Sequence, residues 1–309
     1  MGWINNLFAK KKQTVAVESK STLSGQAEIK AVVLSDLGNI RTNNEDMGLF
    51  FKIADENVIR EKGYMLIVAD GMGGHQAGEV ASRMATDIIS HEYFKQNGGG
   101  VEKNLAKVLT LANKSIFEKA SSSDAHKGMG TTCTVLVVID QAVYYAHVGD
   151  SRAYMQKGNS IMQITTDHTY VQELVNNGDI TEAEAAVHPK RNILTNAMGT
   201  KPDMRVDTGK FGYTLDDNDR LLLCSDGLYD YLNAEELKEI LLANDIKTAA
   251  QILIQQAKAR GGHDNITVVI AERKKETAHS TSLSSGNEKP TRDVELPKMT
   301  RDAELPTEL

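Results

Sequence analysis

The chain has little cysteine, no excess of basic residues and no apolar run long enough to cross a membrane. Its two cysteines, Cys133 and Cys224, stand in apolar strand-like stretches, which argues against a disulfide framework or a zinc cluster. A net charge of −7 provides no basic footprint for nucleic acid. The 309 residues are enough for one large domain. We therefore expect a soluble, cytoplasmic protein without nucleic-acid partners or stable membrane insertion.

Proline is also rare, and three of the five prolines lie in residues 274–309. That segment is rich in Ser, Thr and charge, which predicts a disordered tail. Residues 291–297 recur nine positions later as 300–306, either as a docking or phosphorylation motif or as a duplicated spacer without function. Residues 1–25 are expected to form a flexible extension, although their apolar side chains could touch a membrane or partner. The expected catalytic domain spans residues 26–273.

A strand, a glycine turn and a helix follow one another around Asp70. Residues 63–69 are apolar, residues 70–74 contain three glycines, and apolar residues recur at helical spacing from 77 to 88. Glycines let backbone carbonyls approach a ligand, and a carboxylate at a strand end suits a hard cation. Alone, the pattern is equally compatible with an ordinary structural turn.

Further carboxylates stand at the ends of other predicted strands. Asp150, Asp226 and Asp264 each lie next to glycine or a tight turn, and Glu45 and Asp46 follow Arg41 closely. Repeated oxygen ligands without clustered histidine favour Mg²⁺ or Mn²⁺ over zinc. Two ions would follow naturally from so many carboxylates.

Residues 167–200 are more polar and less regular than the rest of the predicted domain. Long polar segments inside a compact domain often shape substrate access. We interpret this one as a flap-like insertion, with a peripheral helical insertion as the alternative.

Six motifs occur in order within residues 27–272, and together they resemble the metal-dependent serine/threonine protein phosphatases of type 2C (the PPM family), most closely its bacterial members. They are Arg41-x-x-Asn44-Glu45-Asp46, Asp70-Gly71-Met72-Gly73-Gly74-His75, Gly128-Met129-Gly130-Thr131-Thr132, Gly149-Asp150-Ser151-Arg152, Ser225-Asp226-Gly227 and Gly262-His263-Asp264-Asn265. The resemblance implies an α+β fold, a four-layer αββα sandwich of two antiparallel sheets flanked by helices.

The resemblance also implies roles for individual residues, with Arg41, Asp70 and Asp226 as the main catalytic residues. Asp70 would bridge two Mn²⁺ or Mg²⁺ ions, and Arg41 would bind the phosphate. The other expected metal-site residues are the carbonyl of Gly71, Glu45 through water, Asp226, Asp264, Asp46 behind the direct ligands, and Asp150, which with Asp226 would support a third, weaker ion.

The implied reaction is hydrolysis of phosphoserine and phosphothreonine in proteins by a metal-bridging hydroxide, without a covalent enzyme intermediate. Such an enzyme would act as a monomer and reverse a cognate serine/threonine kinase in bacterial signalling. Some members carry a histidine as proposed general acid where this chain has Met72, so leaving-group protonation is unassigned; nearby His75 is more typical of a structural role. The alternatives are a domain that only binds partners and a hydrolase of small phosphorylated metabolites.

Overall fold

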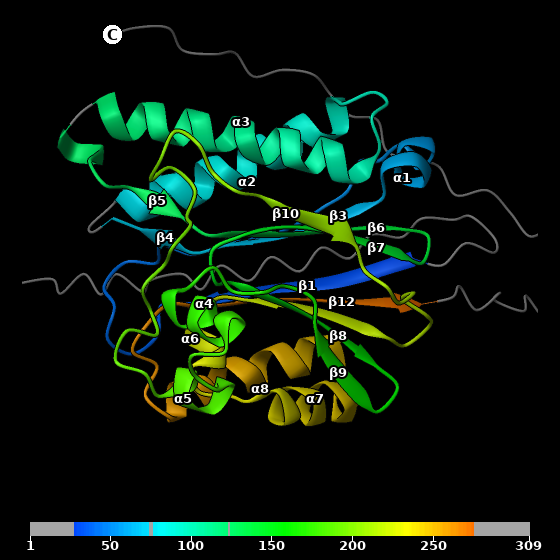
Figure 1. The fold of residues 1–309 in the computed structure, drawn as a ribbon. Helices are drawn as coiled ribbons and strands as arrows, with labels where there is room; N and C mark the ends of the chain where they lie inside the picture. The colour runs from blue at the N-terminus through cyan, green and yellow to red at the C-terminus, as the bar shows by residue number, and fades with distance from the viewer. Residues whose placement is uncertain (1–27, 74–76, 123, 275–309) are drawn as a thin grey trace, which may run out of the picture. The chain divides into compact units, whose positions relative to one another are not determined.

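Two antiparallel five-stranded sheets form the centre of the computed structural model, which describes residues 28–73, 77–122 and 124–274 (Figure 1). The β1 sheet has the order β1 (Glu28–Asp36), β12 (Ile266–Lys274), β11 (Arg220–Cys224), β8 (Arg152–Lys157) and β9 (Ser160–Gln163). The β3 sheet has the order β10 (Asp207–Lys210), β7 (Ala142–Val148), β6 (Cys133–Ile139), β3 (Tyr64–Ala69) and β2 (Met47–Phe51). A short pair, β4 (Gly71–Met72) and β5 (Gly130–Thr131), extends from the ends of β3 and β6.

Helices cover the outer faces of both sheets. The β3 sheet carries the long helices α2 (Ala77–Lys95) and α3 (Val101–Ser122), with α1 (Glu56–Lys62) and the 3₁₀ turn η1 (Asp124–His126) nearby. The β1 sheet is covered by α7 (Ala234–Ala243) and α8 (Ile246–Ala259), and α6 (Asp226–Tyr229) follows β11 directly. Two further short helices, α4 (Tyr170–Asn177) and α5 (Glu182–Ala186), lie in residues 167–200.

Three layers of buried side chains hold this arrangement together. One cluster joins α2 and α3 to the β3 sheet, and another joins α7 and α8 to the β1 sheet. The middle cluster contains Leu66 and Leu136 from one sheet and Leu223 and Val269 from the other, so the two sheets pack face to face. The predicted four-layer αββα sandwich is confirmed, and Figure 1 shows the helices on its two outer sides.

The strongest sequence patterns correspond to the elements that frame the site. Residues 133–148 form a hairpin of β6 and β7, paired from Cys133 with Val148 to Ile139 with Ala142. Glycines follow the end of helix α8, where the amide of Gly262 donates to the carbonyl of Ala257 at 3.1 Å.

Some expectations fall on residues outside the described ranges. They concern the extension at 1–25, the tail beyond residue 274 with its repeat, and His75. Within the described ranges, no helix combines the length and the apolar character needed to span a bilayer.

Candidate metal centre

The predicted carboxylates come together where the two sheets end side by side. Asp70 follows β3 and Asp150 follows β7, both in the β3 sheet, whereas Asp226 follows β11 and Asp264 precedes β12 in the β1 sheet. Electrostatic interactions among Asp46, Asp70, Asp150, Asp226 and Asp264 link all five side chains. The fold thus gathers negative charge from both sheets at one edge.

Two threonines hold the backbone of Asp70: Thr131, the last residue of β5, and Thr132, which follows it. The Asp70 amide donates to the Thr132 hydroxyl at 2.9 Å, and the Asp70 carbonyl accepts from the Thr131 hydroxyl at 2.8 Å. The Thr132 amide also donates to that carbonyl at 2.8 Å. The Thr132 hydroxyl in turn lies 2.6 Å from that of Ser151, which connects the Asp70 loop to the turn that carries Asp150.

Close backbone packing places Gly71 against Glu45. The Gly71 amide donates to the Glu45 carbonyl at 3.2 Å. A Cβ atom on Gly71 would lie 2.2 Å from the carbonyl oxygen of Gly78 and 2.5 Å from that of Glu45, so no larger residue fits here. The amide of Glu45 donates to the side-chain oxygen of Asn265 at 2.8 Å. The motifs that contain Glu45, Gly71 and Asn265 therefore assemble as one unit although they are far apart in sequence.

Asp46 is hydrogen-bonded to Ser225, the residue directly before Asp226. The Ser225 hydroxyl donates to Asp46 at 2.7 Å, and burial raises the pKa of Asp46 to about 6 despite this hydrogen bond. Burial, with Asp150 and Asp264 nearby, raises the pKa of Asp226 well above its ordinary value. The Oδ1 atom of Asp226 is buried and has no hydrogen-bond partner among the described residues.

Arg41 is already paired with one of the predicted metal ligands. Its guanidinium donates to the Asp264 carboxylate at 2.7 Å, while 51% of the Arg41 side chain and 37% of the Asp264 side chain stay exposed. The structure thus places the predicted phosphate-binding residue at the mouth of the acidic site.

Asp150 is buried beside this cluster. Burial, followed by the charge of Asp167, raises the pKa of Asp150 to about 7, and the nearby Arg152 counteracts part of that rise. Asp150 also contributes to the raised pKa values of Asp70 and Asp226. All the predicted site residues therefore belong to one connected region.

The donor set fits oxygen-ligated divalent cations. Burial and the neighbouring carboxylates Asp46, Asp226, Asp150 and Asp264 raise the pKa of Asp70 well above its ordinary value. A buried carboxylate oxygen without a partner, as in Asp226, is unfavourable unless a proton or a cation compensates it. In the part of the chain that the structure describes, however, no three His, Cys, Asp or Glu side chains already stand where they could hold one ion. The carboxylates of Asp264 and Asp46 are instead paired with Arg41 and Ser225, while Asp226 Oδ1 has no such partner among the described residues.

Sequence reasoning assigned no role to the residues that support the ligands. Asn265 is buried and its amide group donates to the carbonyls of Leu37 and Asn43 at 3.1 and 3.0 Å, which fixes the loop leading to Glu45. Thr132 and Ser225 support Asp70 and Asp46 in the same way. Their presence within the motifs was the only available signal.

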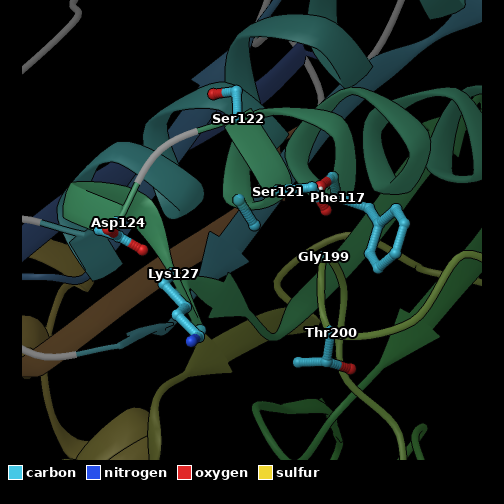
Figure 2. A pocket seen from close by; sticks show the side chains of 9 residues that line it. Phe117, Ser121, Ser122, Asp124, Lys127, Gly199 and Thr200 are labelled. Atoms are coloured by element: carbon cyan, nitrogen blue, oxygen red, sulfur yellow. Dashed lines mark hydrogen bonds between the residues drawn. The ribbon is translucent and has the colours of Figure 1, made fainter.

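A separate cavity of about 670 Å³ lies at the end of α3, and it contains none of the predicted site residues (Figure 2). It is lined by Phe117, Ala120, Ser121, Ser122, Asp124, Lys127, Gly128, Gly199 and Thr200. The cavity adjoins the back of the Asp70 loop, because a Cβ atom on Gly130 would lie 3.0 Å from both Met72 Cε and Thr200 Cγ2.

Comparisons with known proteins agree with this geometry. The profile of the protein phosphatase 2C family matches residues 52–260. The serine/threonine phosphatase Stp of Listeria monocytogenes is 39% identical over 244 residues, covering 77% of this chain and 94% of that protein. The structure of Stp1 from Staphylococcus aureus superposes with a TM-score of 0.72 at 35% identity, covering 83% and 99%. The PstP catalytic domain, solved with two manganese ions, superposes with a TM-score of 0.67 at 32% identity, covering 81% and 100%. The chain belongs to the protein phosphatase 2C family.

Proposed function

We propose that this protein is a metal-dependent phosphatase that hydrolyses phosphoserine and phosphothreonine in proteins. The observation that carries the proposal is the gathering of Asp46, Asp70 and Asp226 at one sheet edge, with the buried Asp226 Oδ1 unpaired among the described residues. Its relatives in Listeria and Staphylococcus are named serine/threonine phosphatases, which supports the same reaction for this chain.

Each residue then has a distinct task. Asp70, Asp226, Asp264, the carbonyl of Gly71 and, through water, Glu45 would hold two divalent cations, and Asp150 would support a third together with Asp226. Bound cations supply positive charge that acidifies water and neutralises the phosphoryl oxygens. The all-oxygen donor set suits Mn²⁺ and Mg²⁺ alike, and manganese in the PstP structure favours Mn²⁺.

The ion pair between Arg41 and Asp264 connects metal binding to phosphate binding. The Asp264 oxygen that accepts from Arg41 at 2.7 Å is not free to coordinate a cation while this ion pair persists. Exchange of Arg41 for a cation would leave the guanidinium, already half exposed, available for the phosphate of the substrate.

Protonation of the leaving group has no assigned residue. Met72 follows Asp70-Gly71 and carries no acidic proton, and its methyl group packs toward Gly130. When the P–O bond breaks, the serine or threonine side chain leaves as an alkoxide that must take up a proton, and we propose that solvent water supplies it.

The wider setting follows from the reaction. A phosphoprotein phosphatase needs phosphoproteins, so a serine/threonine kinase is the expected counterpart in bacterial signalling. We propose that the enzyme acts in the cytoplasm as a monomer. The single domain brings every proposed site residue from its own two sheets, without a second copy.

The test compares turnover of phosphothreonine peptides with turnover of sugar phosphates and nucleotides, in Mn²⁺ and in excess chelator. We expect the peptides to be preferred, and activity to disappear with chelator. Asp226→Asn keeps the size of the side chain but removes an anionic oxygen, so activity should fall by at least about a hundredfold, with weaker Mn²⁺ binding in calorimetry.

Asp87→Asn on the exposed face of α2 is the matched control and should retain normal activity. Full activity in chelator, or a fully active Asp226→Asn enzyme, would contradict the proposed hydrolase. A preference for small phosphate esters would instead assign the site to metabolites, and metal binding without any turnover would indicate a domain that only binds partners.

A further inference from the structure

His168 is a buried histidine that the proposed reaction does not use. It lies just after Asp167 at the beginning of residues 167–200, and only 2% of its surface is exposed. Its Nδ1 atom accepts from the Gly149 amide at 3.2 Å and lies 2.9 Å from the side-chain nitrogen of Asn196. Two donors on Nδ1 place the ring proton on Nε2, which lies 3.0 Å from the Asp207 carboxylate. Both ring nitrogens are therefore used.

His168 and Gly149 form a reciprocal pair of hydrogen bonds. Besides the bond from the Gly149 amide to the ring, the His168 amide donates to the Gly149 carbonyl at 2.7 Å. Gly149 has a φ of +103°, and a Cβ atom there would lie 2.6 Å from the Thr132 side chain. The backbone of this turn therefore packs closely against Thr132 and requires glycine at position 149. The residue next to Asp150 is thus fixed to His168 by two bonds.

The other side of Asp150 is fixed by Asp167. Arg152 donates from Nε and from one terminal nitrogen to the Asp167 carboxylate, the shortest contact being 2.7 Å. Its guanidinium also stacks 3.7 Å above the ring of Tyr229, which lies in the helix that Asp226 opens. A planar two-point contact of this kind fixes orientation as well as distance. Asp167 and His168 therefore hold residues 152 and 149, which flank Asp150.

The two ends of residues 167–200 also meet at His168. The Thr195 amide donates to the His168 carbonyl at 2.9 Å, and the Tyr170 amide donates to the Ile193 carbonyl at 2.8 Å. An isolated β-bridge pairs Thr169 with Leu194. The base of the segment is thus closed by backbone hydrogen bonds beside the turn that carries Asp150.

We propose that His168 is a positioning residue, which fixes the Gly149–Arg152 turn and with it the Asp150 carboxylate to the closed base of residues 167–200. The inference deepens the proposed function, since Asp150 matters for turnover only if the site is the phosphatase centre. Its structural part, the joining of the turn to the segment base by the His168 ring and backbone, can be measured without any activity.

Two substitutions separate the two ring nitrogens. Asn places its terminal atoms where His carries Nδ1, so His168→Asn can still accept from the Gly149 amide. Gln reaches the position of Nε2, so His168→Gln keeps a donor toward Asp207 and loses the acceptor for Gly149. His91→Gln on the exposed side of α2 controls for loss of a histidine as such.

Hydrogen exchange of metal-free protein gives the first readout. In His168→Gln the Gly149 amide should exchange at least about tenfold faster, whereas in His168→Asn and His91→Gln it should stay within about threefold of the unmodified protein. In the unmodified protein the amides of Gly149, His168 and Thr195 should share one opening reaction, with protection factors within about threefold of one another. That measurement needs no variant and so does not depend on a variant folding.

Kinetics with Mn²⁺ gives the second readout. His168→Gln should lower kcat by about tenfold on a small aryl phosphate and a phosphopeptide alike, with little change in KM and with His168→Asn close to the unmodified enzyme. Unchanged Gly149 exchange in His168→Gln, equal losses in both His168 variants, or Thr195 exchanging far faster than Gly149 would overturn the inference. Faster Gly149 exchange in a protein that hydrolyses no phosphate ester would support the structural coupling while rejecting the phosphatase function.

Discussion

Arg41 shows how a single side chain links the two binding events of the site. Its pairing with Asp264 joins residues separated by 223 positions in the sequence. The motifs indicate that both residues serve the site, but no local pattern predicts that they pair. The support of Glu45 by Asn265 escaped sequence reasoning for the same reason, because it depends on where the two sheets end in space.

At this scale, Arg41→Ala should act mainly on phosphate binding. Loss of a planar, charged donor removes binding energy for the phosphoryl group, so KM for a small phosphate ester should rise by about tenfold with a smaller change in kcat. Calorimetry should still detect Mn²⁺ binding, because removal of the Arg41 guanidinium leaves the Asp264 carboxylate available to a cation. The exposed Arg60→Ala variant in α1 serves as control. A lowered kcat with unchanged KM would speak against a phosphate-binding role.

Among the elements, the apolar core strands were predicted from their sequence, whereas strand β10 and helix α1 were not. The apolar strands β3, β6 and β11 carry side chains that are almost all buried, so their hydrophobic runs are unambiguous. Strand β10, with the sequence Asp-Thr-Gly-Lys, has no such run and becomes a strand only by pairing with β7. Helix α1 has no fully buried residue and was missed for a similar reason.

Strand β7 carries a histidine whose burial should affect stability. Burial lowers the pKa of His147 to about 3, below its ordinary value. Between that value and about 6.5 the unfolded chain binds a proton that the folded chain does not, so this stabilising contribution is complete above pH 6.5 and is lost as the pH falls. From pH 6.5 to 5 the loss should be about 2 kcal/mol.

His147→Asn retains a group near Nδ1 for its contact with the Thr134 hydroxyl and cannot titrate in this range. The free energy of unfolding in urea is measured at both pH values for the metal-free unmodified protein and for the variant. The difference between the two proteins cancels the pH dependence of the acidic site, which both contain. The stability advantage of the unmodified protein over the variant should shrink by about 2 kcal/mol on acidification. An advantage that is independent of pH would show that His147 does not titrate as described.

Residues 167–200 form another element whose role stays a prediction. Val187 is 81% exposed there, so its side chain is accessible to a bound peptide. Val187→Asp should change relative kcat/KM values among phosphopeptides several-fold, about 1 kcal/mol, while a small aryl phosphate reacts at the normal rate, since only peptides extend beyond the ions. Leu111→Asp on α3 is the control for a charge at an exposed apolar position. Equal effects on both substrate types would argue against a flap that selects peptides.

For the molecule as a whole, the αββα sandwich was predicted from the family that the ordered motifs resemble, and the structure places those motifs at the ends of core strands from both sheets. Asp70 and Asp226 can approach each other only if the ends of β3 and β11 lie at the same edge. The positions of the motifs along the chain therefore constrain the packing of the two sheets. The pairing of Asp264 with Arg41 and of Asp46 with Ser225, by contrast, depends on the three-dimensional arrangement of the charges and was found only in the structure.

Truncation of the chain can test its expected division into a catalytic domain and a tail. Strand β12 ends at Lys274, which pairs with Glu28 at the start of β1, so a chain truncated after Lys274 keeps every strand of the β1 sheet. We expect it to hydrolyse a small aryl phosphate and a phosphothreonine peptide at the full rate, because every proposed site residue precedes residue 265.

The repeat in residues 291–297 and 300–306 would, as a docking motif, bind partner proteins through two linked contacts. The truncated chain should then lose these partners. Removal of one copy should weaken their binding by tenfold or more, about 1.4 kcal/mol. Affinity capture with the full chain, the single-copy chain and the truncated chain measures this directly. Identical partners and rates for all three would leave the repeat as a spacer, and a slower peptide reaction with an unchanged small-ester reaction would place part of substrate recognition in the tail.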